Sequence, residues 1–113
     1  MATSYKILGQ ANFGNVNTTL YTVPTGKQST VSSITFICGD TGAGNYIRIH
    51  AVKSGQSIGL ENMIYRVNSA EYLGSYSFSD GITLAAGESI QVRGNTAGES
   101  NQTATVFGCE MDA

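Results

Sequence analysis

The sequence predicts an all-β protein, an antiparallel β-sandwich with a jelly-roll-like arrangement of roughly eight strands. Segments rich in β-branched and aromatic residues recur about every ten residues and are separated by turn signals. No stretch of useful length has the apolar period of an amphipathic helix. Charged residues make up only 12% of the chain, so its polarity comes from Ser, Thr, Asn and Gly, which suit strands and tight turns.

The length of the chain is that of one domain. Its 113 residues are enough to bury a core without metal or disulfide support, so we expect a single β-sandwich domain over residues 1–113. Residues 1–17 precede the first clear strand and are expected to form an N-terminal arm or an edge strand.

The N-terminal segment carries several apolar side chains among Gly and Asn. They are Tyr5, Ile7, Leu8 and Phe13. An extended segment of this kind can pair with the sheet edge of a neighbouring subunit, or it can close the sheet of its own domain. We hypothesise that it contacts a neighbouring subunit.

The next two strands flank the only proline of the chain. A strand is expected from Thr18 to Val23, because Pro24 lacks an N–H and ends the ladder of hydrogen bonds. Gly26 is free to take a positive φ in the turn, and the following strand begins at Lys27. The segment therefore predicts a hairpin-like corner.

The strand from Lys27 changes the parity of its apolar side chains. Val31 is at an odd position, whereas Ile34 and Phe36 are at even positions. A period of two cannot place these on one face without an extra residue, so we predict a β-bulge at Ser32–Ser33. The alternative is a strand buried on both faces at its far end.

The middle of the chain continues the strand pattern. Residues 39–44 read as a loop that lacks the Lys-Ser/Thr ending of a phosphate-binding loop. Residues 45–53 predict a half-buried strand, with its isoleucines facing the core and with Arg48 and His50 on the polar face.

The remaining strands follow at short intervals. Residues 58–60 predict a short strand or an irregular edge, and strands are expected at 63–67 and 73–78. The segment "GITLAAGESIQVRGN", residues 81–95, predicts a hairpin whose apolar side chains return to the same side after the turn. A last strand is expected at 103–111.

The residues that most often carry chemistry do not form a recognisable set. His50 lacks a nearby carboxylate and nucleophile, and Asp80, Glu88 and Glu99 fall at separate turns. Cys38 and Cys109 have no metal-binding spacing; they read as small buried residues, with a disulfide as the alternative. We therefore expect no enzyme activity, no cofactor and no metal site.

The tyrosines are better candidates for a functional role. Tyr46, Tyr65, Tyr72 and Tyr76 lie on neighbouring predicted strands. Tyrosine is favoured at protein interfaces because it buries a large ring and keeps a polar hydroxyl. Packing between the sheets of the domain explains the same residues equally well, so both interpretations stay open.

Charge and hydropathy bear on the partners of the chain. The formal net charge is −2 with only 6 Lys and Arg residues, so we expect no nucleic-acid partner. No apolar run has the length of a membrane span, so we expect no membrane association. The start "MATSYKIL" has no pattern of a secretory leader, so we expect that the protein is made in the cytoplasm.

Two segments also carry a family resemblance. "LYTVPTGKQSTVSSITF", residues 20–36, together with residues 81–95 and the closing β segment, resembles small virion structural proteins of tailed bacteriophages, particularly those of cyanobacterial and marine phages. The resemblance spans roughly Thr18 to Met111. It implies a β-sandwich present in many copies, most plausibly a capsid decoration (cement) protein on the capsid surface.

The resemblance also implies partners. These are the major capsid protein and neighbouring copies, with a homotrimer or a monomer at local symmetry axes, in a virion made in the host cytoplasm. The family offers no catalytic residues. The alternative is a tail, neck or fibre module that binds another tail protein or a host-surface glycan, the latter through Tyr65, Tyr72, Tyr76 and Asn68.

Overall fold

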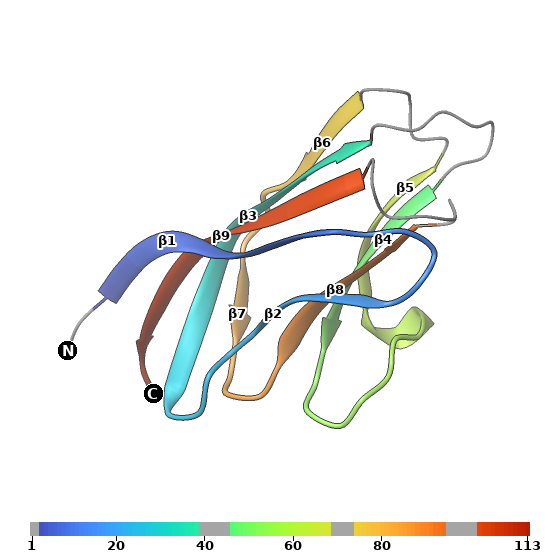
Figure 1. Ribbon diagram of the computed structural model, residues 1–113. Coiled ribbons are helices and arrows are strands. Elements are labelled where there is room, and N and C mark those ends of the chain that lie inside the picture. Colours follow the sequence, from blue (N-terminus) through green and yellow to red (C-terminus); the bar gives the residue numbers. More distant parts are fainter. Residues whose placement is uncertain (1–2, 39–45, 69–73, 95–101) are drawn as a thin grey trace.

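The computed structural model describes residues 3–38, 46–68, 74–94 and 102–113, which form nine strands in two antiparallel sheets (Figure 1). The strands are β1 (Thr3–Asn12), β2 (Thr18–Thr22), β3 (Lys27–Cys38), β4 (Tyr46–Val52), β5 (Met63–Asn68), β6 (Gly74–Phe78), β7 (Ile82–Leu84), β8 (Ser89–Gly94) and β9 (Gln102–Asp112). The predicted all-β antiparallel sandwich is confirmed, with nine described strands in place of the roughly eight expected.

Successive strands often change sheet. Sheet A has the order β1-β9-β3-β6, with β7 also paired to β3, and sheet B has the order β2-β8-β4-β5. All the described pairings are antiparallel. No helix in the described part of the chain is long and apolar enough to cross a membrane.

The long strand β3 contains the predicted bulge. Its register with β9 shifts between Val31 and Ser33, so Ser32 is the extra residue. The Ser32 hydroxyl donates a hydrogen bond to the Phe107 carbonyl at 3.1 Å. On its other side β3 pairs with β7 before the bulge and with β6 after it. The bulge predicted at Ser32–Ser33 is confirmed, and it marks the point where β3 changes partners.

The predicted hairpin over residues 81–95 is wrong. β7 pairs with β3 in sheet A, whereas β8 pairs with β2 and β4 in sheet B. The corner at Pro24 and Gly26 likewise joins sheet B to sheet A, because β2 and β3 are in different sheets. Two strands that face each other across a core show the same inward alternation as two paired strands, so the pattern does not distinguish the two arrangements.

The core fills the space between the inward faces of the two sheets. Sheet A contributes Val31, Ile34, Phe36, Phe78, Leu84, Ala104 and Val106, and sheet B contributes Leu20, Tyr21, Ile47, Ile49, Ile90 and Val92. Each large apolar side chain that is removed from water in this way contributes about 1.5–3 kcal/mol to folding. The β-branched composition of these strands therefore supplies both the strand propensity and the core.

Strand β1 occupies the edge of sheet A beside β9. The N-terminal segment thus closes the sheet of its own domain, and its contact with a neighbouring subunit stays a prediction. The register with β9 shifts between Ile7 and Gly9, which makes Leu8 a bulge residue. A Cβ atom at Gly9 would overlap the backbone carbonyl of Leu20 in β2. The lack of a side chain at Gly9 therefore lets β1 lie against β2.

The two cysteines are far apart in the sheet. Cys109 of β9 is opposite Thr30, whereas Cys38 is opposite Gln102 at the other end of β9. At about 3.3 Å per residue along a strand, this separation exceeds the reach of a disulfide several-fold. Cys109 is a free, buried thiol, as the first of the two interpretations predicted. The side chain of Cys38 is outside the described part.

Some other predictions fall at irregular segments. Of the two expectations for residues 58–60, the short strand is wrong and the irregular segment is confirmed: residues 58 and 59 belong to no strand, and one turn of 3-10 helix, η1 (Leu60–Asn62), begins at Leu60. The predicted loop at 39–44, Tyr72 and Glu99 lie outside the described residues.

Candidate interaction surface

The outer face of β1 carries exposed apolar side chains. Tyr5 is 81% exposed and Ile7 is 51% exposed. In the register with β9, Tyr5 is opposite Cys109 and Ile7 is opposite Phe107, whose side chain is half-buried. Directly opposite residues share one face of a sheet, so Tyr5, Ile7 and Phe107 form one apolar surface, the β1 patch.

Two other predicted interface residues of the N-terminal segment anchor it to the domain. Leu8 is half-buried and packs against the core. Phe13 is completely buried, and its backbone N–H donates to the Gln102 carbonyl at 2.9 Å. The segment therefore divides into side chains that hold β1 in place and the side chains of the β1 patch, which remain open to a partner.

Tyr65 and Tyr76 lie between the sheets. Phe36 has its ring centroid 6.0 Å from that of Tyr65 and 5.9 Å from that of Tyr76, and Tyr65 lies 5.5 Å from Phe78. Both tyrosines are half-buried and pack against the core. The packing interpretation therefore accounts for these two rings, while Tyr72 lies outside the described residues.

A shallow hollow lies beyond the β1 patch on the same two strands. It has a volume of about 330 Å³ and is lined by Gln10, Ala11, Asn12, Thr103, Ala104 and Thr105. The Gln10 side-chain amide donates to the Thr105 hydroxyl at 3.3 Å. The outer face of β1 and β9 is thus apolar at one end and polar at the other.

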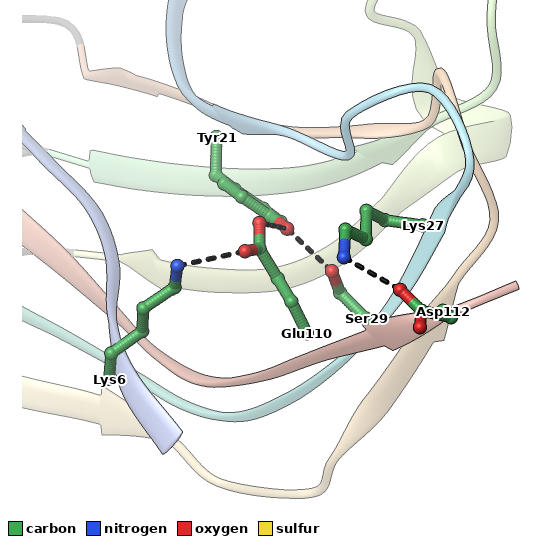
Figure 2. A network of polar contacts seen from close by, with 6 residues as sticks. All are labelled: Lys6, Tyr21, Lys27, Ser29, Glu110 and Asp112. Atoms are coloured by element: carbon green, nitrogen blue, oxygen red, sulfur yellow. Dashed lines mark hydrogen bonds and ion pairs between the residues drawn. The ribbon is translucent and has the colours of Figure 1, made fainter. Parts of the chain in front are cut away.

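A polar network connects the two sheets at the end of the sandwich where the C-terminus lies (Figures 1 and 2). The Tyr21 hydroxyl of β2 donates to the Glu110 carboxylate of β9 at 2.6 Å. The ionised carboxylate only accepts, so the single hydroxyl proton of Tyr21 goes to it and the Ser29 hydroxyl donates to Tyr21. Lys6 pairs with the other Glu110 oxygen at 2.9 Å.

Burial and the hydrogen bond to Glu110 keep Tyr21 protonated. Burial, followed by the hydrogen bond to Glu110, raises the pKa of Tyr21 to about 12. The Tyr21 and Lys6 hydrogen bonds hold the pKa of Glu110 below its usual value. A tyrosine that stays neutral and a carboxylate that stays charged form a stable cross-link between sheets, and neither is tuned to act as a general base or nucleophile near neutral pH.

Next to this network lies a second ion pair, between Lys27 and Asp112 at 2.7 Å (Figure 2). The hydrogen bond from Lys27 to Asp112 raises the pKa of Lys27. Both side chains are largely exposed, so this pair contributes little to stability. Sequence analysis missed the network because Tyr21 and Glu110 are 89 positions apart.

The prediction that His50 lies on the polar surface is wrong. The register between β4 and β5 shifts between Ile49 and His50, and His50 is only 1% exposed. Its Nδ1 lies 2.8 Å from the Asn62 side-chain oxygen, which also accepts a hydrogen bond from the Gly59 N–H at 3.0 Å. The Asn62 side-chain amide donates to the Ser57 carbonyl at 2.8 Å.

The buried histidine has the environment of a structural residue. The Asn62 amide oxygen can only accept, so the His50 Nδ1–H donates the hydrogen bond, and His50 is oriented by Asn62 and not by a carboxylate as in a catalytic triad. Asp80 is exposed at a turn, and Glu88 accepts a hydrogen bond from the Ala85 N–H of its own turn. No group of three metal-binding side chains gathers within the part of the chain that the structure describes.

Comparisons with known proteins identify the fold. A chain of the acidic stable capsid of Helicobacter pylori bacteriophage KHP30 is similar over 99% of this chain and 98% of its own length, with 11% identity and a TM-score of 0.61. A protein of the disulfide-linked pili formed by Bacillus endospore appendages is similar over 98% of this chain and 87% of its own, with 11% identity and a TM-score of 0.54.

No protein-family model and no curated protein sequence matches the chain. At 11% identity the two likenesses concern the fold. Both neighbours belong to large assemblies and are similar over nearly the whole of this chain. The β-sandwich of this protein is therefore one that occurs in a phage capsid and in a pilus.

Proposed function

We propose that this chain is a non-enzymatic structural protein of a bacteriophage virion, and that it serves as a capsid decoration protein. The observation that carries the proposal is the β1 patch, an exposed tyrosine and isoleucine on an anchored edge strand. Rigid aromatic side chains of this kind are typical anchors of protein interfaces. The likeness to a phage capsid chain and the resemblance of residues 20–36 and 81–95 to phage virion proteins both support this role.

The strand order supports a jelly-roll class for the fold. Without the short strand β7, four strands in the order β1-β9-β3-β6 face four in the order β2-β8-β4-β5. Eight antiparallel strands in two sheets that exchange strands repeatedly are the arrangement of jelly rolls, which occur in viral capsids. This class also explains why β7 and β8 belong to different sheets although the turn between them has the sequence of a hairpin turn.

A decoration role has a simple energetic basis. A domain that binds across the boundary between capsid subunits binds the assembled shell and not the free subunits, so mass action stabilises the shell. The partner in this proposal is the major capsid protein, and the chain sits on the capsid surface as a trimer or as a monomer at a local symmetry axis.

The copy number of the chain per purified particle tests the location. Quantitative mass spectrometry against the major capsid protein is expected to give a ratio near one or a simple fraction of it. A few copies to some dozens would place the chain in the neck, tail or fibres and favour the glycan-binding alternative. Absence from the particle would contradict the proposal.

The role of the β1 patch can be tested with matched surface variants. We expect the double variant Tyr5→Ser/Ile7→Ser to bind particles that lack the chain about tenfold or more weakly than the unchanged protein. Leu60→Ser is the control, because Leu60 is 78% exposed and lies outside the patch. Equal binding by the double variant and the control would contradict the assignment of this surface.

A further inference from the structure

The outer face of sheet A has a row of neutral polar side chains across its middle. Thr105 of β9 is opposite Gln10 of β1. On its other side Thr105 is opposite Thr35 of β3, which is in turn opposite Ser77 of β6. Val106, next to Thr105, is buried in the core, so the row projects away from the core.

Apolar side chains lie on both sides of this row. The β1 patch lies toward one end of the strands, and Ile37 lies toward the other end, opposite Thr103. Five large apolar side chains are exposed in the described part of the chain, and three of them, Tyr5, Ile7 and Ile37, are on this face. The polar row, the β1 patch and Ile37 together form what we call the neutral face.

No charged side chain of the described strands of sheet A projects from the neutral face. The charged residues of these strands are Lys6, Lys27, Glu110 and Asp112, which form the two ion pairs at one end of the sandwich. All four occupy positions that alternate with the outward-facing ones. The three arginines of the chain lie in sheet B, directly opposite one another on β4, β5 and β8. The charge of the domain is therefore kept away from one whole face.

A face without charge is suited to bind a copy of itself. Two identical charged faces repel each other, whereas a hydroxyl or a side-chain amide both donates and accepts, so that two copies of the same polar row can hydrogen-bond together. A partner that placed charged side chains on the neutral face would lose their hydration without gaining a counter-charge. Charge complementarity therefore favours a second copy of the chain over a charged partner.

The area of the face is sufficient for a dimer. A residue in a strand covers about 16 Å² of a sheet, so the strands of sheet A present about 650 Å². Two such faces in contact bury about 1,300 Å², which is within the range of about 1,200–2,000 Å² found for stable protein interfaces.

We propose that two copies of this chain dimerise through their neutral faces, with sheet A of one copy packed on sheet A of the other. A two-fold dimer uses the same surface on both subunits, as the self-complementary face requires. The β1 patch is part of this face, so the inference rests on the proposed function and names a second copy as a partner of that patch. A pair of copies binds a particle through two contacts at once, so loss of the pair also weakens particle binding.

The dimer is tested with the full chain in solution, in the absence of any particle. Sedimentation equilibrium is expected to show a monomer and a dimer with a dissociation constant of about 1–100 µM, because the middle of the face is polar. The methyl NMR signals of Thr35 and Thr105 are expected to shift with protein concentration. Those of Thr19, an exposed residue of β2 in sheet B, are expected to stay constant.

A matched pair of variants locates the interface. We expect Thr35→Lys to raise the dissociation constant of the dimer about tenfold or more, because it places a charge without a counter-charge in the middle of the contact. Thr19→Lys is the control, since it makes the same change at an exposed position of sheet B. It is expected to change the dissociation constant less than about twofold. Circular dichroism checks that both variants are folded.

If Thr35→Lys is not folded, Ile37→Ser replaces it and is compared with Leu60→Ser, which is exposed outside the face. A chain that is monomeric at every concentration up to about 500 µM, a trimer, or equal dissociation constants for the variant and its control would each overturn the inference. A monomer that is nevertheless abundant in the particle would contradict the dimer alone. A dimer of a chain that is absent from the particle would support the dimer and contradict the proposed virion role.

Discussion

Tyr21 is the residue whose hydroxyl joins the two sheets. It donates to Glu110 and accepts from Ser29 in a buried position between β2 and β9 (Figure 2). We expect Tyr21→Phe to lower the free energy of unfolding by about 1–3 kcal/mol, because it removes the partner of the buried Ser29 hydroxyl and one of the two side-chain donors to the Glu110 carboxylate. Urea unfolding followed by circular dichroism measures this loss.

The control for that variant is Tyr5→Phe, which removes the same hydroxyl from a side chain that is 81% exposed. Its effect should stay within about 0.5 kcal/mol. If Tyr21→Phe unfolded at the same urea concentration as Tyr5→Phe, the network would not be a stabilising cross-link.

Glu110 makes stability depend on acid pH. Hydrogen bonds from Tyr21 and Lys6 lower its pKa in the folded state below the ordinary value of 4.5. A carboxyl with a lowered folded-state pKa adds stability above its unfolded pKa, and this stability is lost as the pH falls through the folded pKa. The difference in stability between the unchanged protein and Glu110→Gln should therefore shrink below about pH 4.5.

Thermal unfolding between about pH 7 and pH 3 measures this difference. Asp80→Asn removes an exposed carboxylate and serves as the comparison. A gap between the unchanged protein and Glu110→Gln that stayed constant over this range would show that the carboxylate charge does not contribute.

At the scale of elements, β1 is held by its close approach to β2. A Cβ atom at Gly9 would overlap the Leu20 carbonyl, and both strands would have to shift. We expect Gly9→Ala to destabilise the protein by about 1–3 kcal/mol, the usual effect of overpacking. Hydrogen exchange should locate the loss of protection in β1 and in the part of β9 beside it.

Gln10→Ala is the control for this substitution, since Gln10 is an exposed neighbour on the same strand. It should leave the exchange of β1 nearly unchanged. Protection of β1 that was equal in the two variants would mean that the approach of β1 to β2 does not depend on the glycine.

Two register shifts, one in β3 and one in β4, explain why the bulge was predicted correctly and the position of His50 was not. The apolar residues of β3 change from odd to even positions between Val31 and Ile34, so the bulge at Ser32 could be predicted from the sequence. The shift between Ile49 and His50 is not, because a histidine fits either face of a strand. The segment that covers His50 ends in Asn62, and only the folded chain brings the two together.

At the scale of the whole molecule, we expect that the two cysteines form no disulfide and therefore no covalent stabilisation of the fold. Cys38 and Cys109 lie at different ends of the β3–β9 pair. We expect the same melting temperature with and without a reducing agent, because no bond between them is possible within one folded chain. A melting temperature that fell on reduction, at a protein concentration low enough to keep the chain monomeric, would contradict the register of these strands.

The class of fold, the approximate positions of most strands and the bulge in β3 could all be predicted from the residues alone. These follow from alternation, β-branched composition and turn residues, which act over a few neighbouring positions. Such patterns could not predict that Tyr5 and Ile7 are exposed while Phe13 is buried, because the sequence does not show which face of a strand an apolar residue occupies.

The pairing of the strands and the contacts between distant side chains became known only from the folded chain. Strands β7 and β8 belong to different sheets, Tyr21 reaches Glu110 across the sandwich, and three arginines from separate strands align in one row. The physical reason is that partners in a sandwich are selected by register and by packing across the core, over separations that no local pattern records.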